Sequence, residues 1–173
     1  MVKQSDPLFT IGIPTFNRVE LLKQTLQSIL NQTYDDFEII ISNDYVNEKL
    51  TEKSIGISDK RIRIYNQKVN LGEAGNMNFL LSKARGKYFT WQFDDDIYSS
   101  QFLELIESLL SQQRNILCVY SGVGYIYGRK YPNLKSVKNV KKTIYNGKKF
   151  VFDFLKGKVS VAGCCGVFDK VYL

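Results

Sequence analysis

Residues 8–42 read LFTIGIPTFNRVELLKQTLQSILNQTYDDFEIIIS, and this stretch decides the fold class. An apolar run at residues 8–13 is closed by Pro14, which predicts a short buried strand. Residues 19–31 carry leucines and an isoleucine on one face at helical spacing. Residues 37–42 are apolar and rich in isoleucine, as in a second buried strand. A strand, a helix and another buried strand predict an α/β fold with a parallel sheet.

The same alternation continues along the chain, without an internal repeat, a low-complexity tract or a flexible linker. Further strands are expected at residues 61–65, 87–93, 116–123 and 159–168, and further helices at residues 75–85, 102–110 and 150–155. We therefore expect a mostly parallel central sheet flanked by helices. Ligands of open α/β sheets bind at the carboxyl ends of the strands, so site residues are expected in the loops that follow the strands.

The composition narrows the chemistry. None of the 173 residues is a histidine, which excludes histidine-based zinc sites and serine-histidine or cysteine-histidine catalysis. Any metal must rest mainly on oxygen ligands, which indicates Mg²⁺ or Mn²⁺. The first residues lack the apolar core of a signal peptide, and no stretch approaches the roughly 20 apolar residues of a membrane span. We expect a cytoplasmic domain.

Lysines gather in a basic region at residues 135–149, and the formal net charge of the chain is +7. Such a region can contact nucleic acid, anionic lipid or a phosphorylated substrate. A solvated loop explains the same lysines without any partner. Of the functional interpretations we favour peripheral contact with a membrane surface over nucleic acid.

Three consecutive aspartates, Asp94, Asp95 and Asp96, end the strand expected at residues 87–93. Adjacent carboxylates repel one another unless a positive group is shared between them, and burial increases the repulsion. A divalent cation on substrate phosphates would resolve this, since Mg²⁺ uses one or two carboxylates together with phosphate oxygens. The alternative is that Asp96 is the N-cap of a helix and the other two are solvated. Capping explains only one of the three aspartates.

The turn Pro14-Thr15-Phe16-Asn17-Arg18 follows the first expected strand. It offers backbone groups, an aromatic face and an amide at a place where a nucleotide base could stack. The alternative is a plain strand-to-helix loop in which Asn17 is the N-cap.

Two further polar clusters lie after strands or before helices. Asn43-Asp44 ends the second strand and could accept hydrogen bonds from a base or a ribose, or could simply form a turn. Residues 70–78 contain two glycines and three asparagines before a helix. Free backbone N–H groups at a helix start attract anions, but a glycine-rich helix start without a ligand explains this loop equally well.

In order and spacing, these residues resemble the family 2 glycosyltransferases with a GT-A fold. The resemblance rests on the turn at residues 14–18, on Asp44, on Asn70-x-Gly72 and on the aspartates at 94–96. It is close over residues 9–110 and looser beyond. It implies a Rossmann-like GT-A fold in a single domain, with residues 1–110 as the nucleotide-sugar-binding part and residues 111–173 as the start of the acceptor-side part.

The resemblance also implies site roles and ligands. Phe16 and its neighbours would pack against the base, Asp44 would bond the base edge, and Asp94 would reach the ribose. Asp95, or Asp96 in the competing register, would hold Mg²⁺ or Mn²⁺ between the donor phosphates. The expected set for a nucleotide-diphosphate sugar, with a UDP-sugar favoured, is Pro14, Thr15, Phe16, Asn17, Arg18, Asp44, Gly72, Asn76, Asp94 and Asp95, and the expected metal ligands are Asp95 and Asp96.

The chain departs from the family pattern in places. Met77-Asn78 stands where many relatives carry Arg-Asn, and Asn43-Asp44 stands where many carry two aspartates and Gly-Ser. Relatives place an acidic catalytic base after the strand expected at residues 159–168. Asp169 lies too early for that role, so we expect the base beyond Leu173 and an acceptor side that is cut short.

The leading hypothesis is an inverting glycosyltransferase domain that moves a sugar from its nucleotide donor to an acceptor hydroxyl. The resemblance implies a sugar or lipid-linked acceptor, in bacterial surface polysaccharide synthesis. The alternative is a module that binds a nucleotide-sugar without turnover. A nucleotidyltransferase is disfavoured because no glycine-rich loop with a lysine or arginine lies near the first strand.

Overall fold

The computed structural model describes residues 5–113, 116–121, 143–160 and 166–173. Its strands are β1 (Phe9–Thr15), β2 (Phe37–Asn43), β3 (Ile62–Asn66), β4 (Tyr88–Trp91), β5 (Cys118–Tyr120) and β6 (Gly166–Asp169). Its helices are α1 (Val19–Leu30), α2 (Glu52–Ile55), α3 (Gly72–Lys83), α4 (Phe102–Gln112) and α5 (Gly147–Leu155), and a 3₁₀ turn follows at Lys170–Tyr172. In these ranges no helix is both long enough and apolar enough to cross a membrane.

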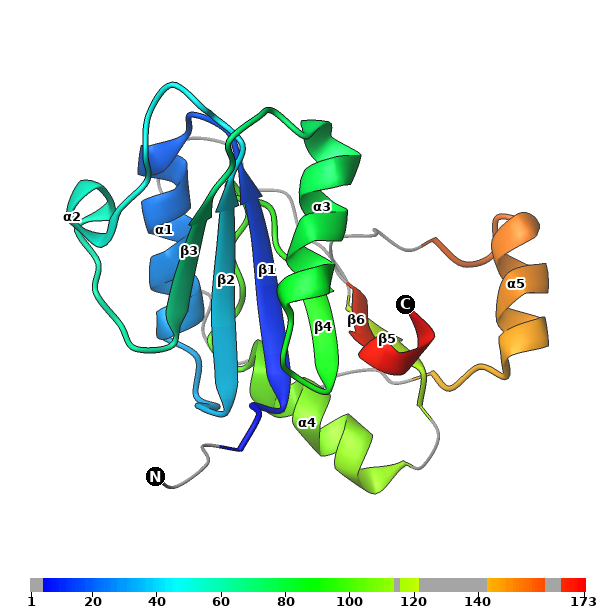
Figure 1. The fold of residues 1–173 in the computed structure, drawn as a ribbon. Coiled ribbons are helices and arrows are strands. Elements are labelled where there is room, and N and C mark those ends of the chain that lie inside the picture. The colour runs from blue at the N-terminus through cyan, green and yellow to red at the C-terminus, as the bar shows by residue number, and fades with distance from the viewer. Residues whose placement is uncertain (1–4, 114–115, 122–142, 161–165) are drawn as a thin grey trace, which may run out of the picture.

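The six strands form one sheet in the order β3-β2-β1-β4-β6-β5 (Figure 1). The β3, β2, β1 and β4 strands run parallel to one another, whereas β6 runs antiparallel to both β4 and β5. The mostly parallel central sheet expected from the sequence is therefore confirmed. Because β1, β2 and β4 are parallel, the loops that follow them open at the same edge of the sheet.

Helices cover both faces of the sheet. Alternate residues of β2 point to opposite faces, so Ile39 and Ile41 join the larger core, which α1 and α4 complete. Ile40 points the other way and packs with Leu80 of α3 and with Phe89. Figure 1 shows α3 in front of β1 and β4, with α1 behind the sheet.

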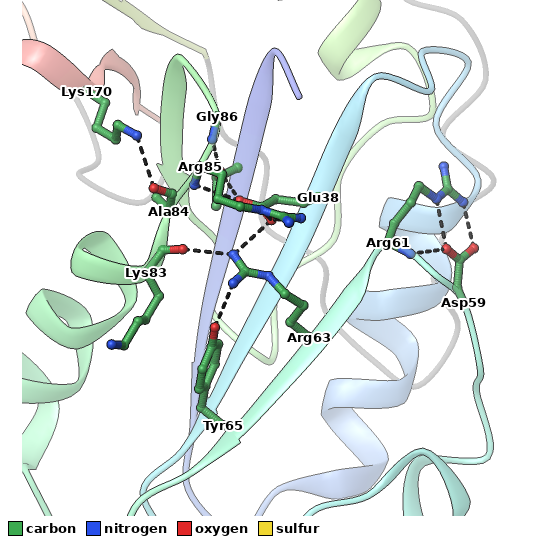
Figure 2. A network of polar contacts seen from close by, with 11 residues as sticks. Glu38, Asp59, Arg61, Arg63, Tyr65, Lys83, Ala84, Arg85, Gly86 and Lys170 are labelled. Carbon is green, nitrogen blue, oxygen red and sulfur yellow. Dashed lines mark hydrogen bonds and ion pairs between the residues drawn. The ribbon is translucent and has the colours of Figure 1, made fainter. Parts of the chain in front are cut away.

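The amino ends of the strands are joined by a buried ionic network around Glu38 (Figure 2). Glu38 is only 2% exposed, and its carboxylate accepts hydrogen bonds from Thr10 Oγ1 at 2.8 Å, Arg63 Nη2 at 2.9 Å and Arg85 Nε at 2.8 Å. Gly86 N–H donates to Thr10 Oγ1 at 2.8 Å. These contacts tie β1, β2, β3 and the start of β4 together, at the end of the sheet opposite the loops considered next.

Candidate functional site

The loops after β1 and β4 meet through a buried carboxylate. Thr15, the last residue of β1, donates from Oγ1 to Asp94 Oδ2 at 2.6 Å. Asp94 is fully buried, and Thr15 is 5% exposed. The sheet therefore brings together two of the residues that the sequence assigns to the site, although 79 positions separate them.

Arg18 holds two of the three aspartates of this cluster. Its Nε donates to Asp94 Oδ2 at 3.2 Å, and its Nη1 donates to Asp95 Oδ2 at 3.0 Å. Its Nη2 also lies 2.5 Å from Asp94 Oδ1, an ion-pair contact without hydrogen-bond geometry. One guanidinium thus lies against both carboxylates.

Burial and mutual repulsion destabilise the charged forms of Asp94 and Asp96. Burial raises the pKa of Asp94, and so does the charge of Asp95, whereas the Thr15 hydroxyl and the Arg18 guanidinium oppose the rise. Desolvation raises the pKa of Asp96, and Asp95 and Asp94 raise it further. In the described part of the chain, the Asp96 carboxylate has no hydrogen-bond or ion-pair partner. A further cation beside Asp95 and Asp96 would relieve this repulsion.

The chemistry of the cluster fits a hard divalent cation, because Asp95 and Asp96 are both exposed and offer oxygen ligands. Within residues 5–113, 116–121, 143–160 and 166–173, no group of three or more acidic or cysteine side chains is arranged to hold a metal unaided. A metal at this edge would therefore need oxygens from a ligand as well, as Mg²⁺ does when it binds substrate phosphates.

Both capping alternatives are wrong. The α4 helix begins at Phe102 with Gln101 at its N-cap, so Asp96 caps no helix there. The α1 helix begins at Val19 with Arg18 at its N-cap. Asn17 instead adopts a left-handed backbone conformation with φ of 54°, a conformation that asparagine tolerates better than most residues.

An exposed aromatic pair lies beside the cluster. Phe16 is 49% exposed, and its ring meets that of Tyr45 edge to face, with 5.3 Å between the centroids. A small pocket next to this pair is lined by Thr15, Asn17, Arg18, Val19, Asn43, Tyr45, Glu48, Lys49, Leu50 and Ser54. Tyr45, Glu48 and Lys49 are site residues that the sequence reasoning missed. An aromatic residue directly after Asn43-Asp44 was the available signal for Tyr45.

Two asparagines hold the loop that forms one wall of this pocket. Asn43 Nδ2 donates to the Glu48 carbonyl at 2.8 Å and to Asn66 Oδ1 at 3.0 Å. Asn66 Oδ1 also accepts from Leu50 N–H at 2.7 Å, and Asn66 Nδ2 donates to the Leu50 carbonyl at 2.9 Å. The ends of β2 and β3 thereby fix residues 45–50. Asn66 was also missed, although it stands at a strand end as Asn43 does.

Asp44 is placed against the start of α3. Its Oδ1 accepts from Leu71 N–H at 2.8 Å and its Oδ2 from Gly72 N–H at 3.0 Å, and the residue is only 4% exposed. Gly72 has a φ of 71°, which favours glycine. The backbone N–H groups at this helix start were expected to attract an anion. Two of them instead donate to the carboxylate of Asp44. Its contact with a base stays a prediction.

Asn76 of α3 is buried beneath the same loop. Its Nδ2 donates to the Ser42 carbonyl at 3.1 Å, so this side chain joins α3 to the end of β2. Its Oδ1 has no hydrogen-bond partner among the described residues. The predicted residues Gly72 and Asn76 thus lie behind Asp44, whereas Phe16, Arg18 and Asp95 face solvent.

Glycosyltransferases from other organisms are similar to this chain in sequence. The chain is 34% identical over 164 residues to the GalNAc(5)-diNAcBac-PP-undecaprenol beta-1,3-glucosyltransferase of Campylobacter jejuni. The aligned residues cover 89% of this chain and 49% of that protein. It is 34% identical over 157 residues to an uncharacterized glycosyltransferase of Methanocaldococcus jannaschii. That alignment covers 88% of this chain and 54% of the relative. The chain thus spans about half the length of these two relatives.

Solved structures share the fold. One is S. aureus TarS 1-349 in complex with UDP-GlcNAc, with a TM-score of 0.59, 19% identity, and coverage of 72% of this chain and 36% of that one. Another is the mannosyltransferase PcManGT of Pyrobaculum calidifontis in complex with GDP-Man and Mn²⁺, with a TM-score of 0.56, 18% identity, and coverage of 68% and 36%. The expected GT-A fold is confirmed. The family model for Glycosyl transferase family 2 matches residues 10–173, and the chain belongs to that family.

Proposed function

We propose that this chain carries the donor-binding part of an inverting glycosyltransferase, which moves a sugar from a nucleotide-diphosphate sugar to an acceptor hydroxyl. One observation carries the proposal: the exposed Phe16–Tyr45 pair and the acidic cluster at 94–96 open at the same edge of the sheet. An aromatic face suits a nucleotide base, and carboxylates suit a ribose and a phosphate-bound cation.

The residues divide the work by their surroundings. Phe16 would stack on the base, and the buried Asp94, held by Thr15, would accept from the ribose. Asp95 and Asp96 would hold Mg²⁺ or Mn²⁺, which would supply Lewis-acid stabilisation for the departing diphosphate. Arg18 places a positive charge beside the same carboxylates and can donate to phosphate oxygens.

We propose the donor and the acceptor by analogy with the relatives. TarS was solved with UDP-GlcNAc and PcManGT with GDP-Man, and of these nucleotides we propose a UDP-sugar. The Campylobacter relative is named for an undecaprenol-linked substrate, so we propose a sugar or lipid-linked acceptor in surface polysaccharide synthesis. A cytoplasmic site with membrane contact through the basic region at residues 135–149 belongs to this proposal. Of that region, residues 143–149 are described, and they include exposed Lys148 and Lys149.

A second candidate function is nucleotide-sugar binding without turnover by this chain. Of the four described acids after Asp96, three are paired elsewhere or lie away from the cluster. Asp153 pairs with Lys149 on α5, and Glu104 accepts from Thr33 Oγ1 at 2.7 Å. Asp169 lies opposite Tyr88, at the amino end of β4, whereas Asp94 follows its carboxyl end. None of these three acids is placed to deprotonate an acceptor beside Asp94.

Calorimetry of the chain with UDP and GDP, with and without Mn²⁺, tests the first proposal. We expect binding of one nucleotide that weakens sharply when a chelator removes the metal. The double variant Asp95→Ala with Asp96→Ala should lose the metal dependence. The double variant Asp6→Ala with Asp35→Ala removes the same charge from exposed positions outside the site and should behave like the wild type. Unchanged affinity and metal dependence in the first double variant would mean that the cluster does not bind the metal.

A further inference from the structure

We infer that Arg18 is an internal counter-ion of the acidic cluster, which occupies Asp95 in the ligand-free protein and competes with a divalent cation for it. The inference rests on the proposed function for the identity of that cation. It adds a positioning role for Arg18 that the resemblance did not imply.

The geometry shows how one guanidinium serves two carboxylates. Nε and Nη2 face Asp94, at 3.2 Å from Oδ2 and 2.5 Å from Oδ1, while Nη1 reaches Asp95 Oδ2 at 3.0 Å. Among the described residues, no other lysine or arginine forms an ion pair with the three aspartates. Arg18 is thus the cation that now balances a cluster suited to a metal.

The two contacts differ in burial. Asp94 is fully buried and also accepts from Thr15, so its pairing with Arg18 is shielded from solvent on the carboxylate side. The side chain of Asp95 is 45% exposed, and that of Arg18 is 46% exposed. Exposed ion pairs contribute little, because water and salt screen them. Asp95 can therefore be released at low cost while Asp94 keeps its partners.

The backbone of Arg18 need not move for this exchange. Its carbonyl accepts from Leu22 N–H at 3.0 Å, which fixes the residue at the N-cap of α1. A small change in the side-chain torsion angles is enough to move Nη1 off Asp95 while Nε and Nη2 stay beside Asp94. The freed Nη1 can then donate to a phosphate oxygen of the donor, since guanidinium N–H groups match phosphate oxygens.

Competition predicts a gain of metal affinity when the charge is removed. Free Mn²⁺ can be measured by electron paramagnetic resonance in solutions of the full chain, with Mn²⁺ alone as the probe. Arg18→Gln should bind Mn²⁺ tighter than the wild type, on the order of fivefold, the effect of one nearby unit charge in a watery site. Arg18→Lys keeps the charge and should stay close to the wild type. Arg61→Gln removes an equal charge paired with Asp59 and Asp35 and should leave Mn²⁺ binding unchanged. Equal or weaker Mn²⁺ binding by a folded Arg18→Gln would overturn the inference.

A second measurement uses the wild type, in case Arg18→Gln does not fold once Asp94 loses its ion pair. The ¹⁵N–¹H resonance of Arg18 Nε should shift on titration with Mg²⁺ alone, and a resonance that stays in place at saturating Mg²⁺ would also overturn the inference. The proposed function fails separately. If neither UDP nor GDP binds while Arg18→Gln still gains Mn²⁺ affinity, the counter-ion role stands and the donor assignment falls.

Discussion

Phe16 is a large apolar side chain that is exposed beside the acidic cluster. A phenylalanine that is 49% exposed adds less to the stability of the fold than a fully buried one, since about half of its surface stays in water. Phe16→Ala should weaken nucleotide binding by about 1–3 kcal/mol, the loss expected for base stacking on an aromatic ring. The melting temperature should hardly change. Calorimetry with the nucleotide that binds the wild type measures the loss.

Phe152 supplies a matched control for this prediction. It is 54% exposed, lies on α5 and belongs to no part of the site. Phe152→Ala should therefore leave nucleotide affinity at the wild-type value. Equal affinities for Phe16→Ala and the wild type would mean that the base lies elsewhere.

Glu38 is the carboxylate on which stability at neutral pH depends most clearly. Burial alone would raise its pKa, but hydrogen bonds from Arg85 and Thr10 and the charge of Arg63 outweigh burial and lower the pKa (Figure 2). A carboxylate with a lowered native pKa adds stability above its unfolded pKa, and this stability is lost as the pH falls through the native pKa.

Glu38→Gln should therefore lower the free energy of unfolding at pH 7 by about 1.5–3 kcal/mol, the range for hydrogen bonds to a charged group. Urea denaturation at pH 7 and at successively lower pH should show the difference from the wild type shrinking below the ordinary pKa of glutamate, 4.5. Glu52→Gln, at an exposed position in the first turn of α2, should cost little at any pH. If the difference in free energy of unfolding between Glu38→Gln and the wild type stays constant with pH, the stability comes from the packing of the side chain and not from its charge.

Among the helices and strands, those with strong local patterns were predictable from the sequence. The β1, β2 and α1 elements lie where the apolar runs and the helical spacing placed them, because their side chains meet the core with the same periodicity. The start of α3 was predicted three residues late, at Gly75 rather than Gly72. Asp44, a residue of another loop, binds the N–H groups of Leu71 and Gly72, and no local pattern carries such a contact.

The last strands show a second limit of local reasoning. An apolar run predicts a strand but not its direction, so the antiparallel pairing of β6 with β4 and β5 could not be derived. Cys118 lies in the apolar run at residues 116–120, which predicts a buried side chain, but it is exposed because β5 forms an edge of the sheet. Strand order, which decides the burial of an edge, is a property of the complete sheet.

The candidate site was also predictable only in part from the sequence. Which residue types would gather at the sheet edge was predictable, because parallel strands end together and the polar clusters follow those ends. Which side chains of the site contact one another was not predictable. The Arg18 contacts with Asp94 and Asp95 join residues 76 and 77 positions apart, and the Asn43–Asn66 contact joins residues 23 apart. Such pairings depend on side-chain rotamers and loop paths that the spacing of motifs does not fix.

In the described part of the chain, the residues assigned to the donor site precede residue 97, and they lie at the ends of parallel strands, in the loops that follow them and at the start of α3. The α5 helix lies beyond β5 and β6 in Figure 1 and contributes none of them. Its region nevertheless carries a large share of the charge that could attract a nucleotide, through lysines such as Lys148, Lys156 and Lys158. A nucleotide could therefore bind at either of two places, the sheet edge or the basic region around α5.

Hydrogen exchange with and without nucleotide and Mn²⁺ decides between them. A ligand that binds only the folded state stabilises it by about 2.7 kcal/mol at 100 times its dissociation constant. If the ligand bridges the loops after β1, β2 and β4, exchange should slow at residues 14–18, 45–50 and 94–96 together. Residues 143–160 should exchange as before, since most of them are exposed and none touches the site. Protection confined to residues 143–160 and abolished by high salt would instead describe an anion held by surface lysines, because screening weakens exposed charges far more than buried contacts.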